Sequence, residues 1–168
     1  MVLGLSIQNF TLLHVVISLI AIASGVVVVF AMLRANASPG WTVLFLITTV
    51  LTTVTGFLFP ITVFTPALGV GILSSLILIV ALFALYAKKL EGAWRWIYVV
   101  TAVFAFYLNV FVLVVQAFQK IGALNALAPN GSEPPFVVAQ AVVLGAFIVL
   151  GTLAVMRFRP LLGRVAPT

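Results

Sequence analysis

The side chains best suited to chemistry in this 168-residue chain are neutral and polar, and they lie inside long apolar runs. His14 is the single histidine, and Asn109, Gln116 and Gln140 are carboxamides set among aliphatic and aromatic residues. A carboxamide carries two donor hydrogens and an acceptor oxygen, which its own helix cannot fully satisfy. These four side chains are therefore the strongest candidates for hydrogen bonds between helices or for contacts with a ligand.

A second group of polar atoms comes from the stretch LITTVLTTVTGFLFP at residues 46–60, where five threonines occupy eight positions. At the 100° step of a helix these hydroxyls form one face about 160° wide, which includes Thr52 and Thr55. Ser18 lies one turn after His14 and extends a second polar stripe. A threonine hydroxyl can bond the carbonyl one turn back, so helix packing is the simpler explanation of the face. A polar cleft remains the alternative.

Several kinds of reaction are excluded by what the chain lacks. Cysteine is absent, so thiol nucleophiles, disulfides and thiolate metal sites are ruled out. The carboxylate side chains are Glu91 and Glu133, and both lie between apolar runs. One chain therefore cannot assemble a catalytic carboxylate pair, a Ser-His-Asp relay or a multi-ligand metal site, and bis-histidine haem would need two chains. We expect no enzyme activity, no catalytic residue, no metal site and no cofactor.

Membrane-spanning helices are the elements that must position these side chains. The chain is 65% hydrophobic and 6% charged, whereas charged residues make up about a quarter of a soluble domain. Five apolar runs are long enough to cross a hydrocarbon core, which takes about 20 helical residues. We expect an all-α polytopic membrane protein, with residues 1–168 forming a single transmembrane domain. Its bundle of five transmembrane helices should cover residues 10–33, 41–59, 66–87, 96–118 and 136–157.

Basic residues predict how the helices cross the membrane, because cytoplasmic loops retain Lys and Arg during insertion. Lys120 falls on one side, whereas the other seven of the eight basic residues share the opposite side: Arg34, Lys88, Lys89, Arg95, Arg157, Arg159 and Arg164. The tryptophans also lie at span ends on this basic side: Trp41, Trp94 and Trp96. These signals predict an outside N-terminus and a cytoplasmic C-terminus for a multi-pass protein of a bacterial inner membrane.

With this orientation the polar side chains gather toward the outer leaflet. At 1.5 Å per residue, His14, Thr55 and Gln140 each lie about 6 Å inside the outer ends of their spans. A shared outward cleft would require these three side chains and Gln116 to converge on one cavity. The predicted ligand-binding residues are His14, Ser18, Thr52, Thr55, Asn109, Gln116 and Gln140.

Four stretches carry a resemblance to a known group of proteins: LHVVISLIA at 13–21, GFLFPITVFTPALGVGI at 56–72, GAWRWIYVVTA at 92–102 and SEPPFVVAQ at 132–140. The chain resembles small five-span bacterial membrane proteins known only as hypothetical proteins, and the similarity covers all five spans. The resemblance implies no assigned activity. Members often carry histidines between spans two and three, where this chain has Thr62 and Leu68. The resemblance therefore implies no metal or haem role here.

These observations favour an integral inner-membrane binding or accessory protein. Hydrogen-bonding groups without a countercharge suit a small apolar or neutral ligand, such as a quinone or a lipid-like molecule. A passive carrier or channel for a small neutral solute is one alternative, and a structural subunit of a larger membrane complex is another. No nucleic acid partner is expected, because the basic residues flank apolar runs. A homodimer or a membrane-protein partner is predicted from small-residue pairs: Ala21 and Gly25, Gly71 and Ser75, and Ala141 and Gly145.

Overall fold

The computed structural model describes residues 2–60 and 63–159, a part of the chain that is helical and contains no β-strand. Five helices are long and apolar enough to cross a membrane: α1 (Ile7–Leu33), α2 (Pro39–Phe57), α3 (Pro66–Leu82) with its continuation η1 (Phe83–Ala87), α4 (Trp94–Lys120) and α6 (Pro134–Arg157). A short helix, α5 (Gly122–Leu127), lies between α4 and α6 and was not predicted. The all-α architecture with five apolar helices is confirmed.

Helix ends differ from the predicted spans by up to three residues, and a capping residue or a proline extends the starts of α1, α2 and α6 beyond their apolar runs. The helix α1 begins at Ile7, where the side-chain oxygen of Ser6 accepts a hydrogen bond from the backbone N–H of Asn9 at 3.2 Å. Three other helices begin at a proline, whose fixed φ and missing N–H suit the first turn: Pro39, Pro66 and Pro134.

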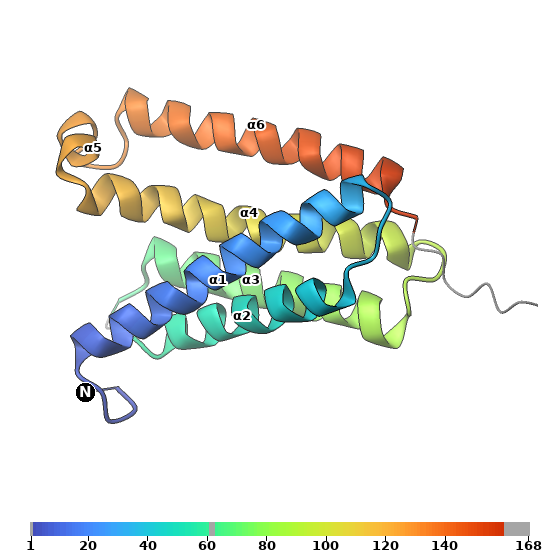
Figure 1. Ribbon diagram of the computed structural model, residues 1–168. Coiled ribbons are helices and arrows are strands. Elements are labelled where there is room, and N and C mark those ends of the chain that lie inside the picture. Colours follow the sequence, from blue (N-terminus) through green and yellow to red (C-terminus); the bar gives the residue numbers. More distant parts are fainter. Residues whose placement is uncertain (1, 61–62, 160–168) are drawn as a thin grey trace, which may run out of the picture.

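The helix α4 is the centre of the bundle, since it packs against α1, α2, α3 and α6. Figure 1 shows α1 crossing α4 obliquely, with α6 beside α4. The crossing point of α1 and α4 includes Gly25, which faces the ring of Phe106; a Cβ atom at Gly25 would lie 2.7 Å from that ring. The missing side chain therefore allows the two helices to approach closely.

The hydrophobic core lies on one side of this crossing, toward the C-terminus of α1 and the N-terminus of α4. Ala154 of α6 belongs to it, and most of its other buried members come from α1, α2, α3 and α4, including Val28, Met32, Phe45, Leu46, Leu78, Tyr98, Val99 and Val103. Side chains of four helices interdigitate there with little exposure. The well-packed core is thus confined to one half of the bundle.

Basic residues lie at the same end of the bundle as this core. They follow or begin helices there: Arg34, Lys88, Lys89, Arg95, Arg157 and Arg159. Arg164, the seventh residue of the predicted basic side, lies outside the described residues. Arg95 Nη1 donates to the carbonyl oxygens of Val155, at 3.1 Å, and Phe158. This guanidinium caps the last turn of α6 and joins it to the start of α4.

Two of the three predicted small-residue pairs are used within the chain. Gly25 faces Phe106 of α4, and a Cβ atom at Gly71 would lie 3.1 Å from the Phe57 ring of α2. At Gly145 of α6, by contrast, an added Cβ atom would meet none of the described residues within 4 Å. The third pair therefore lies on a face of α6 that is open to lipid or to a partner.

Candidate functional site

A cavity of about 650 Å³ lies between α1, α2, α3 and α4, at the end of the bundle opposite the six basic residues described above. Its lining on α1 runs from Thr11 to Ile22, a length of about 16 Å at 1.5 Å per residue. The next turn of α1 brings Gly25 against Phe106, and the packed core begins there. The cavity therefore occupies the half of the bundle that the core leaves loosely filled.

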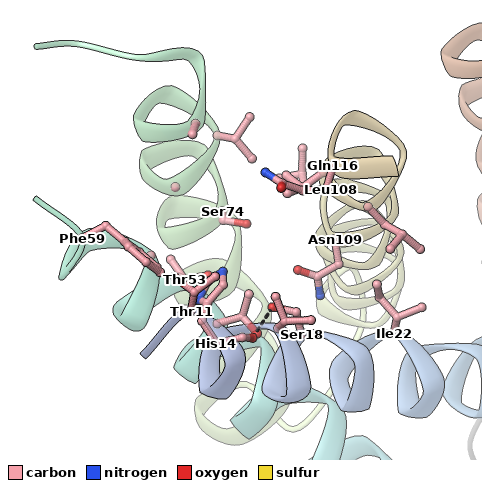
Figure 2. Close-up of a pocket in the computed structure, with 18 of the residues that line it drawn as sticks. Thr11, His14, Ser18, Ile22, Thr53, Phe59, Ser74, Leu108, Asn109 and Gln116 are labelled. Atoms are coloured by element: carbon pink, nitrogen blue, oxygen red, sulfur yellow. Dashed lines mark hydrogen bonds between the residues drawn. The ribbon is translucent and has the colours of Figure 1, made fainter. Parts of the chain in front are cut away.

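Five of the seven predicted binding residues line this cavity: His14, Ser18, Thr52, Asn109 and Gln116. Figure 2 shows four of them extending from α1 and α4 into the space between these helices and α3. Asn109 and Gln116 are seven residues apart, which is close to two helical turns, so one face of α4 carries both. Helical spacing aligns the polar groups within each helix, and helix packing brings the polar groups of three helices to one cavity.

Thr55 lies behind His14 rather than on the cavity wall, and its predicted placement is corrected. Its side chain is buried, and its hydroxyl donates to the carbonyl oxygen of Leu51 at 2.7 Å. The same oxygen lies 2.7 Å from His14 Nδ1. The rotation of α2 turns Thr55 toward α1 and leaves Thr52 and Thr53 to face the cavity.

Gln140 lies outside the cavity, so the expected convergence of Gln140 with His14 and Gln116 is wrong. Its Nε2 donates to the carbonyl oxygen of Phe111 on α4 at 3.2 Å. Its Oε1 is buried and has no partner in the described part of the chain. The helix α6 contacts α4 and α1 but contributes no residue to the cavity lining. Gln140 therefore joins α6 to α4 and does not line this cavity.

The imidazole of His14 is held on two sides. Thr55 contacts its Nδ1 atom, and Phe59 packs edge-to-face against the ring with centroids 5.4 Å apart. Phe59 in turn packs against Phe10, with ring centroids 5.0 Å apart. These contacts restrict the ring, and His14 and Phe59 both line the cavity. The histidine is thus pre-positioned rather than free to rotate into solvent.

Helix packing explains only part of the threonine face of α2. Three hydroxyls donate to carbonyl oxygens one turn back, as the sequence predicts: Thr48, Thr53 and Thr55. Thr49 instead accepts a hydrogen bond from Asn109 Nδ2 at 3.2 Å. Thr52 Oγ1 is buried and finds no partner among residues 2–60 and 63–159. Thr52 is also one of the residues that line the cavity, so the α2 wall of the cavity contains a polar group that packing leaves unpaired.

The structure also adds polar lining residues that were not predicted to bind. Ser74 of α3 is buried, and Figure 2 shows it extending into the same space as Asn109. Lys120 lies one turn beyond Gln116 at the cavity's outer end, and Thr11 lies one turn before His14. These two residues share a helix face with Gln116 and His14, because residues three or four apart lie on the same side of a helix. Nothing in the sequence distinguishes Ser74 from Ser75, because that choice depends on how α3 is rotated against α4.

The lining chemistry suits binding through hydrogen bonds within apolar walls. Its polar groups are hydroxyls, carboxamides, one imidazole and the Lys120 ammonium, whereas aliphatic and aromatic side chains form most of the wall. No cluster of three or more metal-ligating His, Asp or Glu side chains occurs in the portion that the structure describes. Among known proteins, no family model, no curated protein and no solved structure matches this chain.

Proposed function

We propose that this chain is an integral membrane binding protein that holds a small apolar or neutral ligand, quinone-like or lipid-like, between α1, α2, α3 and α4. The cavity is the observation that supports this proposal. Its volume of about 650 Å³ lies within the range of about 300–1,000 Å³ that is typical of small-molecule sites. Apolar walls with a few convergent polar groups are also typical of such sites.

The distribution of side chains along the cavity supports an elongated ligand. Apolar residues such as Val15, Leu19 and Val112 line the length of the cavity, while His14, Asn109 and other polar groups interrupt it. A hydrocarbon portion would exclude water from these walls, and a polar ring or headgroup would meet the hydrogen-bonding groups. A quinone or a single-chain lipid has both parts.

Packing in the other half of the bundle favours binding over passage of a solute. Between the cavity and the basic end lie fully buried residues of the core, including Phe45 and Val99. A channel would need a continuous path lined by polar groups or water across this region. Solute flux into proteoliposomes would support the carrier alternative, whereas a purely structural subunit would show neither flux nor a ligand.

We further propose that the cavity faces the outside of a bacterial inner membrane. The six described basic residues beyond the core support a cytoplasmic location for that end, with the N-terminus outside and the C-terminus inside. The protein would act without catalysis of its own. A homodimer or a membrane-protein partner remains part of the proposal, with the open face of α6 near Gly145 as the contact region.

Ligand retention by the purified protein tests the proposed function. The change Ser18→Phe places an aromatic ring in the cavity, and it removes only a hydroxyl that bonds the carbonyl oxygen of His14 in its own helix. The change Thr152→Phe is the matched control, because that hydroxyl also bonds its own helix but is exposed on α6.

Native mass spectrometry and lipid extraction should find a co-purifying small molecule in the wild type and in Thr152→Phe, and at least tenfold less in Ser18→Phe. Equal retention in all three proteins would place the ligand elsewhere. Absence of any retained molecule, together with no binding of added quinones or lipids, would refute the proposal.

A further inference from the structure

The hydrogen-bond partners of Thr55 determine which nitrogen of His14 carries a proton. Thr55 Oγ1 lies 2.7 Å from the carbonyl oxygen of Leu51 and 2.7 Å from His14 Nδ1. A threonine hydroxyl has one hydrogen, and a carbonyl oxygen has none. The contact with Leu51 therefore uses the Thr55 hydrogen, and the contact with His14 needs a hydrogen from Nδ1. Only this assignment provides a hydrogen for both short contacts.

The remaining ring nitrogen then faces the ligand as an acceptor. A neutral imidazole carries one N–H, so protonation at Nδ1 leaves Nε2 with a free lone pair. Nε2 has no hydrogen-bond partner among the described residues, and His14 lines the cavity. The described lining residues also include no carboxylate that could accept a proton from this nitrogen.

Asn109 presents a second acceptor in the same cavity. Its Nδ2 donates to Thr49 Oγ1 at 3.2 Å, while its Oδ1 has no partner within the described ranges. Thr49 is fully buried on α2, so this bond orients the carboxamide from behind the cavity wall. Figure 2 shows Asn109 extending from α4 into the cavity, where its oxygen is available to a ligand.

We propose that the cavity selects an apolar ligand that donates hydrogen bonds through hydroxyl groups. This inference rests on the proposed function and specifies its ligand class. A quinol or a hydrophobic phenol or alcohol would donate to His14 Nε2 and Asn109 Oδ1. The corresponding quinone or ether has only acceptor oxygens, which can pair with the donors of Gln116 and Lys120 but leave His14 Nε2 and Asn109 Oδ1 unpaired. A site whose buried polar groups stay unpaired rejects such an analogue.

Two matched pairs of probes test this selectivity. They also show whether the site recognises quinols in particular or hydrophobic hydroxyl compounds in general. The first pair is decylubiquinol and decylubiquinone, and the second is 4-nonylphenol and its methyl ether. Affinities are measured with the full chain in lipid nanodiscs, with the quinol kept reduced. We expect the hydroxyl member of a pair to bind at least tenfold more tightly. Selectivity in the first pair alone identifies a quinol site, and selectivity in both identifies a general hydroxyl site.

The other outcomes distinguish this inference from the proposed function. Equal binding within both pairs, or tighter binding of the quinone and the ether, overturns the acceptor assignment while leaving a ligand cavity. Failure of all four probes to bind overturns the proposed function, and the acceptor assignment with it.

The hydroxyl of Thr55 can be removed without placing a new group in the cavity. In Thr55→Val the Nδ1–H loses its acceptor, so the ring is free to adopt the other tautomer. We expect the preference for the hydroxyl probe to fall at least threefold, because a ring protonated at Nε2 donates to a quinone or ether oxygen instead of accepting from a hydroxyl. Thr48→Val is the control, because that buried hydroxyl bonds Leu44 and does not line the cavity. An unchanged preference in Thr55→Val contradicts the inference.

The tautomer can be observed without any ligand, because His14 is the single histidine of the chain. In untagged protein with ¹⁵N-labelled histidine, NMR should show a protonated Nδ1 and an unprotonated Nε2 for the neutral ring. Addition of the quinol should shift the Nε2 signal and leave Nδ1 protonated. A wild-type ring protonated at Nε2 instead would overturn the inference, even if every variant folds.

Discussion

His14 Nδ1 and Thr55 Oγ1 lie 2.7 Å apart although 41 residues separate them in the sequence. This hydrogen bond joins α1 to α2 directly behind the wall of the cavity. Together with the Phe59 ring, it determines how the imidazole is presented to a ligand. The contact therefore connects the packing of two helices to the chemistry of the candidate site.

A double-mutant cycle should detect this bond as a coupling between the two residues. Hydrogen bonds between helices in membranes average about 0.6 kcal/mol, with a maximum of about 1.7 kcal/mol. We expect His14→Phe and Thr55→Val to show a coupling free energy in that range for unfolding in bicelles. A coupling indistinguishable from zero would mean that the contact contributes nothing measurable. The control cycle pairs His14→Phe with Thr48→Val, whose hydroxyl is bonded within α2.

Replacing Thr52 should affect the stability of the protein and its ligand binding differently. Its Oγ1 is buried without a partner in the described structure, a situation that costs about 1–3 kcal/mol in the absence of a ligand. Thr52→Val should therefore leave the unfolding free energy of the empty protein unchanged or raise it, and should leave ligand retention unchanged because this oxygen is shielded from the cavity. Chemical unfolding and native mass spectrometry provide the two measurements. A marked loss of stability in the empty protein would indicate a hidden partner for this hydroxyl.

Gly25 and Gly145 form a matched pair for testing helix packing. An added methyl at Gly25 meets the Phe106 ring at 2.7 Å, and overpacking of this kind costs about 1–3 kcal/mol. At Gly145 the same methyl meets no described atom within 4 Å, and alanine is favoured over glycine in helices by about 1 kcal/mol. Gly25→Ala should lower the thermal midpoint and Gly145→Ala should not. Equal effects would contradict the crossing of α1 and α4 at Gly25.

Single cysteines can test the proposed orientation, because the native chain has none that would label. Ser132 and Lys89 are exposed at opposite ends of the bundle. With an outside N-terminus, Ser132→Cys should react with a membrane-impermeant maleimide in intact cells, and Lys89→Cys should react only after permeabilisation. The reverse pattern would invert the orientation, and equal labelling of both in intact cells would contradict the five-span arrangement.

Glu133 should make the start of α6 sensitive to acid. The backbone N–H of Asn130, with further hydrogen bonds from Ser132 and the Asn130 side chain, lowers the pKa of this carboxyl from 4.5 to about 2. A carboxyl whose pKa is depressed on folding stabilises the fold above its unfolded pKa, and that contribution is lost as pH falls from about 4.5 to about 2. The amides of Asn130 and Ser132 should exchange faster across this window. Glu133→Gln should remove the pH dependence, and a carboxyl titrating near 4.5 would contradict it.

The sequence by itself determined the elements and the depth of their polar groups. In hydrocarbon a single chain segment must satisfy its own backbone hydrogen bonds, so each long apolar run has to be a helix. The rise of 1.5 Å per residue then places His14, Ser18, Thr52 and Asn109 at related depths. Helical spacing also predicts that Asn109, Gln116 and Lys120 share one face, and the structure brings all three to the cavity.

Only the tertiary structure decided which helix each polar face meets. Gln116 and Gln140 are similar residues near the outer ends of apolar helices, yet the first lines the cavity and the second bonds Phe111 across the α4 and α6 contact. In a soluble helix, an apolar stripe marks the buried face. In a membrane, lipid is as apolar as a neighbouring helix, so apolar residues surround the helix. Their positions in the sequence therefore do not show which face contacts another helix. The rotation of each helix depends on close contacts such as Gly25 against Phe106, which join residues far apart in the chain.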